Sequence, residues 1–315
     1  MILFMMMYLM SFHLVMSSDD WFVVWMGLEV NMMMFIMLMY ERYSMFNVES
    51  CMKYFFIQSL GSAIFISMFY FSGEFLDWVS CLILSYKVGA GPFFFWFPSL
   101  CSGISWMSCF ILMTFQKIIP LLLVSVFVSW MFILIVLVSL VMGIFGSLNQ
   151  KDLKQLIAYS SIYHLGWIFL CIFYNDLLWM SYLFMYIILM FPVIYFVNFK
   201  NVFNFTDIKI VNNKGFLMIL LLSMAGMPPF LGFFIKWYVF SKIMEFSMFI
   251  VVMLIISSVV MFYVYFRMLY DLLLGCFNMG IWENSMFFKK FIIWLDLMSG
   301  VGFLFGMMMS LWLLF

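Results

Sequence analysis

The sequence predicts an all-α protein that crosses a membrane about eleven times. Of its 315 residues, 68% are hydrophobic and only 9% are charged. A soluble domain of this length carries roughly a quarter charged residues. Such a composition cannot cover a surface that faces water, so most of the chain is expected to be surrounded by lipid. The length of the apolar runs and the sorting of charges between them lead to the same fold class.

Eleven apolar runs approach the length of about 20 residues that a membrane helix needs. Residues 104–147 are almost continuously apolar over about twice a bilayer thickness, so they are expected to turn once, after Pro120. The first run lacks the basic residues of a signal or transit peptide and is expected to be the first membrane helix. The runs lie near 1–16, 21–40, 52–71, 76–96, 104–124, 128–147, 153–173, 179–198, 215–241, 247–270 and 291–313.

The charges in the connections predict the orientation of the chain. If connections alternate sides, basic residues gather on one side, as the positive-inside rule describes. The N-terminus is then expected on the positive side and the C-terminus on the opposite one, and an even helix count would spoil this separation. The positive side receives Arg42, Lys53, Lys151, Lys154, Lys200, Lys209, Lys214, Arg267, Lys289 and Lys290. The other side receives Lys242 and the acids Asp19, Asp20, Glu74, Asp77, Asp176 and Glu245.

Two of the expected helices contain residues that break helices. Lys87 is followed by Gly89, Gly91 and Pro92, and Gly226 is followed by two prolines, residues 228 and 229. Carbonyl groups freed inside a membrane are tolerated only where protein or a water-filled cavity takes them up. Each break falls in the fourth helix of a group of five. We therefore expect one membrane domain, 1–315, with inverted repeats over about 1–124 and 128–270 and a last helix over 291–313.

Five ionisable residues fall inside the expected spans: Glu29, Lys87, Lys117, His164 and Lys236. A central charge costs about 2.5–3.5 kcal/mol on insertion scales, so such residues usually face the bundle interior and move ions. Burial disfavours the charged form of lysine. A carboxylate about 4 Å away favours that form by roughly 4 kcal/mol at an effective dielectric near 20. Movement of Glu29 could therefore switch Lys87 between holding and releasing a proton.

These residues predict a proton path. Lys87 would pass protons to Lys117, and water, Ser160, Ser161 and His164 would bridge to Lys236. Structural alternatives stay open for each member of the path: Lys117 and Lys236 could extend to an interface, His164 could be a core histidine, and Glu29 with Lys87 could form only a buried pair.

Other kinds of site find little support in the sequence. A net charge of zero argues against a nucleic-acid partner. No dinucleotide fingerprint, P-loop or haem attachment motif is present, so redox chemistry is expected elsewhere. The cysteines lack metal-binding spacings, which argues against a zinc or iron–sulfur site; they are Cys51, Cys81, Cys101, Cys109, Cys171 and Cys276.

Several segments resemble the chain 2 family of mitochondrial NADH–ubiquinone oxidoreductase, or complex I. They cover 25–31, 53–59, 87–96, 116–120, 146–150, 156–167 and 228–237, in the family's order. The resemblance implies an antiporter-like subunit of the mitochondrial inner membrane, with its N-terminus in the matrix and its C-terminus in the intermembrane space. It also implies that Glu29, Lys87, Lys117 and Lys236 match the family's proton-pathway residues. The 36 methionines resemble mitochondrial decoding, which predicts a mitochondrial gene without an import signal.

The same resemblance implies that this chain holds no cofactor. NADH, FMN, iron–sulfur clusters and ubiquinone are expected in other subunits. The implied partners are other membrane-arm and accessory subunits and membrane lipid, with cardiolipin as a candidate. The sequence departs from a common animal pattern at Phe94, where many members have histidine, and at Ala225–Gly226, where many have two glycines. The first departure puts any role for that histidine in doubt.

Two other functions stay open from the residues alone. A sodium–proton antiporter subunit without a redox partner would use the same lysines. A membrane scaffold would carry no protons, and the buried charges argue against it.

Overall fold

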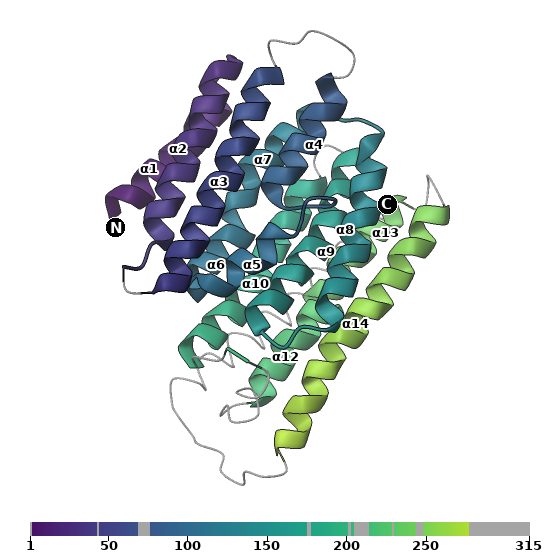
Figure 1. Ribbon diagram of the computed structural model, residues 1–315. Coiled ribbons are helices and arrows are strands. Elements are labelled where there is room, and N and C mark those ends of the chain that lie inside the picture. Colours follow the sequence, from purple (N-terminus) through teal and green to yellow (C-terminus); the bar gives the residue numbers. More distant parts are fainter. Residues whose placement is uncertain are drawn as a thin grey trace. The chain divides into compact units, whose positions relative to one another are not determined.

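In the computed structural model, the elements formed by the described residues are α-helices (Figure 1), which confirms the predicted all-α membrane class. It describes residues 2–42, 44–68, 76–174, 178–200, 203–204, 214–228, 230–243 and 248–276. The expected last helix, 291–313, lies outside these residues. Within them, seven spans are long and apolar enough to cross a membrane: α2 (Trp21–Met39), α3 (Met45–Met68), α6 with α7 (Trp106–Met113 and Phe115–Val126), α8 (Met131–Leu148), α9 (Leu153–Tyr174), α10 (Leu178–Lys200) and α14 (Met248–Cys276).

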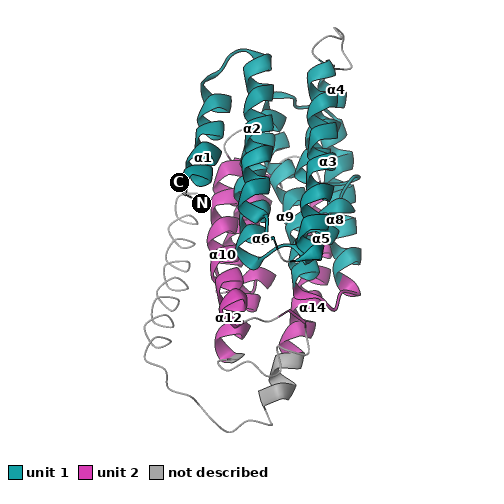
Figure 2. Cartoon of the chain, turned by 60° about the vertical axis from the view of Figure 1, so that its left-hand side comes forward, with its two compact units in different colours: residues 1–147, 154–176 teal, residues 148–153, 177–315 magenta. Residues whose placement is uncertain are grey.

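The remaining helices are shorter: α1 (Ile2–Ser17), α4 (Leu76–Val88), α5 (Trp96–Gly103), α12 (Lys214–Ala225) and α13 (Leu231–Ile243). The chain forms two compact units, residues 1–147 with 154–176 and residues 148–153 with 177–315 (Figure 2). In the first unit, α1, α2, α3 and α4 pack in chain order, and α7 packs on both α4 and α6. In the second unit, α12 packs on α10, α13 and α14.

Two interruptions have the same backbone geometry. Gly89 (φ 77°) follows α4 and Gly226 (φ 83°) follows α12, both in the left-handed region that glycine adopts without steric cost. At the first, the amides of Gly89 and Ala90 donate to carbonyl groups of Tyr86 and Ser85, at 3.2 and 3.0 Å. The amides of Gly226 and the next residue repeat this pattern, at 3.3 Å each. Both ends are Schellman motifs, which stop a helix cleanly and leave nearby carbonyl groups open to side chains.

A third interruption was not expected from the sequence. The predicted helix over 104–124 is divided at Thr114 (φ −120°, ψ −81°), whose hydroxyl donates to the carbonyl of Phe110 at 2.6 Å. Such a bond competes with the helix backbone and bends it. Pro120 lies inside α7, and the chain turns after Val126, as predicted for this long apolar stretch. The helix expected over 52–71 also begins earlier than predicted, since α3 starts at Met45.

Small residues let α8 and α9 approach closely. A Cβ atom at Gly143 of α8 would lie 2.8 Å from the backbone nitrogen of Tyr163 in α9. One at Gly166 of α9 would lie 2.8 Å from Oγ of Ser139 in α8. Small residues at helix interfaces are how membrane helices gain packing energy where no hydrophobic effect drives them together.

We expect Gly143→Ala to lower the heat stability of the chain. The added methyl group meets backbone, which cannot rotate away, so the overpacking costs about 1–3 kcal/mol. Gly215→Ala is the matched control, because a Cβ there meets nothing within 4 Å and alanine is the better helix former. Thermal-shift mass spectrometry of mildly solubilised membranes measures both. Equal melting curves for the two variants would contradict the proposed close contact.

Candidate functional site

The predicted ionisable residues all lie on described helices, and four of them are almost fully buried. Lys87 is 5% exposed, Lys117 3%, His164 4% and Lys236 7%, whereas Glu29 is partly exposed. Neither Lys117 nor Lys236 extends to the surface, so the structure does not support the interfacial alternative for these two lysines.

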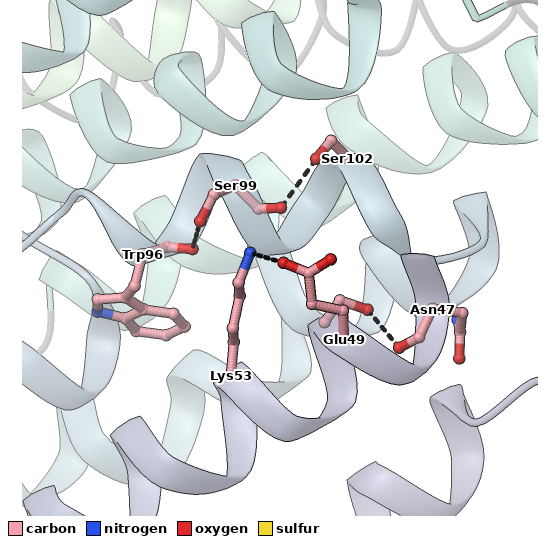
Figure 3. A network of polar contacts seen from close by, with 7 residues as sticks. Asn47, Glu49, Lys53, Trp96, Ser99 and Ser102 are labelled. Atoms are coloured by element: carbon pink, nitrogen blue, oxygen red, sulfur yellow. Dashed lines mark hydrogen bonds and ion pairs between the residues drawn. The ribbon is translucent and has the colours of Figure 1, made fainter. Parts of the chain in front are cut away.

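A surface pair shows the contrast. Lys53 and Glu49 on α3 form an ion pair at 2.6 Å, and their side chains are 48% and 60% exposed (Figure 3). Exposed pairs of this kind contribute at most about 1 kcal/mol to stability. The buried lysines must be held by other groups.

Lys87 occupies the last turn of α4, just before the first interruption. Its carbonyl accepts from Nε2 of Gln58 at 2.9 Å, and the carbonyl of Tyr86 accepts from the indole of Trp96 at 3.2 Å. Gly61 of α3 makes room for the lysine stem, because a Cβ there would lie 2.9 Å from Cγ of Lys87. These contacts fix the end of α4 and the course of the lysine side chain together.

Glu29 on α2 interacts electrostatically with Lys87, but no direct ion pair joins these two described residues. The carboxylate of Glu29 instead accepts a hydrogen bond from the hydroxyl of Ser62 on α3. The predicted buried pair is therefore not formed in this arrangement, and α3 supplies the nearest partner of the carboxylate.

Lys117 connects α7 to α5 and α9. It lies in the first turn of α7, with Nζ 5.0 Å from the centre of the Phe97 ring and 3.5 Å from the carbonyl oxygen of Ser161. A cation over an aromatic face is attracted by the ring quadrupole. His164 follows Ser161 by one turn of α9, and its ring contacts that of Tyr163 at a centroid distance of 5.4 Å. The first unit thus brings Lys117 to the predicted serine–histidine segment.

Lys236 belongs to the second unit, on α13. Its Nζ donates to the carbonyl of Ala225, the last residue of α12, at 3.1 Å. A cavity of about 240 Å³ opens beside this contact, and its wall includes Phe233, Trp237 and Phe262. The amine is therefore held at the second interruption, beside a mainly apolar space.

Lys154 was predicted in a connection, but the structure buries it at the start of α9. It is 8% exposed, its Nζ donates to the carbonyl of Ile104 at the end of α5, and it lies 5.4 Å from the centre of the Trp106 ring. Its position near Lys151 and Asp152 favoured a solvated location. No sequence signal indicated that the interruption between α5 and α6 would expose a carbonyl group to it.

A polar network beside Lys117 was also missed. Nε2 of Gln116 donates to Asn31 and to Tyr54 at 2.5 and 2.6 Å, and its Oε1 accepts from Tyr8 at 2.9 Å. Asn31 in turn donates to Ser11 at 3.0 Å. The network joins α1, α2, α3 and α7 and fixes the turn of α7 that carries Lys117.

Two further features bear on chemistry. Phe94, in the first interruption, is buried against Phe95 and offers no titratable group there. Among the described residues, no group of three or more His, Cys, Asp or Glu side chains is arranged to hold a metal ion.

Known proteins share both the sequence pattern and this fold. The family described as NADH:quinone oxidoreductase/Mrp antiporter, TM, matches residues 76–261. NADH-ubiquinone oxidoreductase chain 2 of Anopheles gambiae is 35% identical over 300 residues, which cover 89% of this chain and 88% of the mosquito protein. The Aedes aegypti chain 2 is 36% identical over 84% of each chain.

This chain belongs to the NADH–ubiquinone oxidoreductase chain 2 family.

Solved structures extend the likeness to the fold of the family. A chain of respiratory complex I from Thermus thermophilus, solved with bound aureothin, superposes with a TM-score of 0.79 at 22% identity. The match covers 96% of this chain and 78% of the bacterial one. The chain therefore has the antiporter-like fold of complex I membrane subunits.

We expect Lys154→Met to destabilise the chain. The change removes a charge-assisted hydrogen bond and leaves the buried Ile104 carbonyl without this donor, a loss of about 1–3 kcal/mol. Lys154→Arg should retain most of the stability, and Lys151→Met, at an exposed neighbour, should have little effect. Melting temperatures of the chain in mildly solubilised membranes test this order. The helix-end role is wrong if Lys154→Met melts together with Lys151→Met.

Proposed function

We propose that this chain moves protons through the mitochondrial inner membrane along Glu29, Lys87, Lys117, His164 and Lys236. The observation that carries the proposal is the near-complete burial of three lysines in apolar helices, two of them at helix interruptions. Ionisable residues are retained at such depth when they serve a pathway.

As a member of the chain 2 family, the chain is a membrane-arm subunit of NADH–ubiquinone oxidoreductase. Its proposed partners are the other membrane-arm subunits, accessory subunits and lipid, with cardiolipin as a candidate. NADH, FMN, iron–sulfur clusters and ubiquinone would be held by those other subunits, since this chain carries no motif for them. Redox chemistry would act on this chain through changes of conformation or charge at its boundaries.

The proposed path begins with Glu29 and Lys87. When Glu29 approaches, its negative charge favours the protonated lysine, and when it withdraws, burial favours release. The released proton would pass through water to Lys117, which reaches α9 at Ser161. Water and the segment with Ser160 and His164 would then lead toward Lys236.

The proposed architecture has eleven spans, with α4–α5, α6–α7 and α12–α13 each crossing as one interrupted helix. Inverted repeats over about 1–124 and 128–270 would be followed by a last helix at 291–313. The matching Schellman motifs at Gly89 and Gly226 support this pairing of α4 with α12. An inverted pair of repeats with broken helices is a common basis of transport across the bilayer midplane.

A sodium–proton antiporter without a redox partner is the rival function. The matching family description names both classes, so that match alone does not separate them. The chain 2 relatives favour the respiratory enzyme. Proton movement that depends on NADH oxidation but not on sodium would distinguish the two functions.

Replacement of Lys87, Lys117 or Lys236 by methionine should lower the number of protons moved per NADH oxidised several-fold. Each change removes a proton-accepting amine from the path while keeping most of the side-chain volume. Lys53→Met, at an exposed lysine of α3, is the control and should pump normally. Acidification of sealed inner-membrane vesicles, measured together with NADH oxidation, gives the ratio. Normal ratios in all three lysine variants would exclude the path.

The orientation can be tested on two exposed connections. We propose that the N-terminus lies in the matrix, which puts Asp20 on the intermembrane side and Glu41 on the matrix side. In Asp20→Cys, an impermeant thiol reagent should label the introduced cysteine in mitochondria whose outer membrane is broken and whose inner membrane is intact. In Glu41→Cys, the reagent should label the chain only in inner-membrane vesicles whose matrix side faces the medium. The reverse pattern would overturn the orientation, and the parent chain corrects for its own cysteines.

A further inference from the structure

Ser62 has two acceptors for one hydrogen. Its hydroxyl is placed to donate to Oε1 of Glu29 on α2 and to the carbonyl of Ser59, one turn earlier on α3, at 2.9 Å. A serine hydroxyl carries a single donor hydrogen. The two hydrogen bonds are therefore alternatives, and the state of Glu29 decides which one forms.

The two protonation states of Glu29 make opposite demands on this hydroxyl. An ionised carboxylate only accepts hydrogen bonds, whereas a protonated one also has an O–H to donate. With Glu29 ionised, Ser62 donates to it in a charge-assisted bond. With Glu29 protonated, the acid donates to Oγ of Ser62, and the serine hydrogen turns to the carbonyl of Ser59. Every donor has an acceptor in both arrangements, and no heavy atom needs to move.

We propose that Ser62 is a positioning residue that lets Glu29 take up and release a proton while α2 and α3 stay in contact. The inference rests on the proposed proton path and adds the group that supports its first carboxylate. A proton delivered by water forms the O–H bond of the acid, and release to water breaks the same bond. The serine keeps its own hydrogen throughout and only rotates.

The surroundings fit a hydroxyl that turns in place. Ser62 is 1% exposed, so bulk water does not compete for either bond. Its neighbour Gly61 lies against Cγ of Lys87, and the charge of Glu29 acts electrostatically on Lys87. One turn of α3 thus contacts both Glu29 and Lys87. The charge on Glu29 can then change without disturbing the packing that orients the lysine.

The test compares Ser62→Ala with Ser62→Thr in the assembled enzyme in sealed vesicles. Infrared difference spectra give the carboxyl band of protonated Glu29, which is assigned by its loss in Glu29→Gln. In Ser62→Ala, we expect this band to move to higher frequency and protons per NADH to fall several-fold. Ser62→Thr, which keeps the hydroxyl, should restore both. Ser67→Ala, which removes an exposed hydroxyl on the same helix that bonds only its own helix backbone at Ile64, should alter neither.

The outcomes separate the inference from the path. Normal pumping in Glu29→Gln would show that the path through Glu29 is wrong. Loss of pumping in Glu29→Gln, together with an unmoved carboxyl band and normal pumping in Ser62→Ala, would overturn only the role of Ser62. If Ser62→Ala fails to assemble, Ser62→Cys takes its place with the same readouts, because a thiol has similar volume but donates weakly.

Discussion

An ammonium group buried among apolar helices needs oxygen atoms around it, and in this chain helix-end carbonyl groups supply them. Lys236 donates to the end of α12 and Lys154 to the end of α5. In the second unit, Arg267 donates to the carbonyl of Leu148. The C-terminal end of a helix carries a partial negative charge, so each contact combines a hydrogen bond with a favourable dipole. A cation can be kept at depth in this way without a fixed carboxylate beside it.

That interaction explains why helices are interrupted inside the membrane. Within a continuous helix each carbonyl group already accepts a backbone hydrogen bond, and only the last turn leaves carbonyl groups without an intrahelical partner. Gly89 and Gly226 end α4 and α12 through left-handed turns that satisfy some carbonyl groups and leave others to Gln58, Trp96 and Lys236. The interruption and the buried amine therefore depend on each other. Without the amine, freed carbonyl groups would be costly in an apolar environment.

The sequence predicted features that depend on local composition. The length of the apolar runs predicted most of the spans. The neighbouring glycines and prolines predicted the interruptions at Gly89 and Gly226. The interruption at Thr114 was missed because threonine is common within helices, and only its bond to Phe110 disturbs the backbone. Ser62 and Lys154 were missed for another reason. Their partners, Glu29 and Ile104, lie 33 and 50 residues away along the chain, so only the packing of helices brings them together.

The three lysines on the proposed path have different surroundings. Identical amines in identical surroundings would hold a proton equally well and give it no preferred position. Lys87 lies in the last turn of α4, and Nζ of Lys236, on α13, reaches the end of α12, where the helix dipole favours a cation. Lys117 lies in the first turn of α7, at the positive end of its helix, and its amine contacts the Phe97 ring and the carbonyl of Ser161. Lys117 is thus held by an aromatic ring and a carbonyl of α9, whereas Lys236 is held by a helix-end carbonyl. On the proposed path, the charge on Glu29 would decide when a proton leaves Lys87.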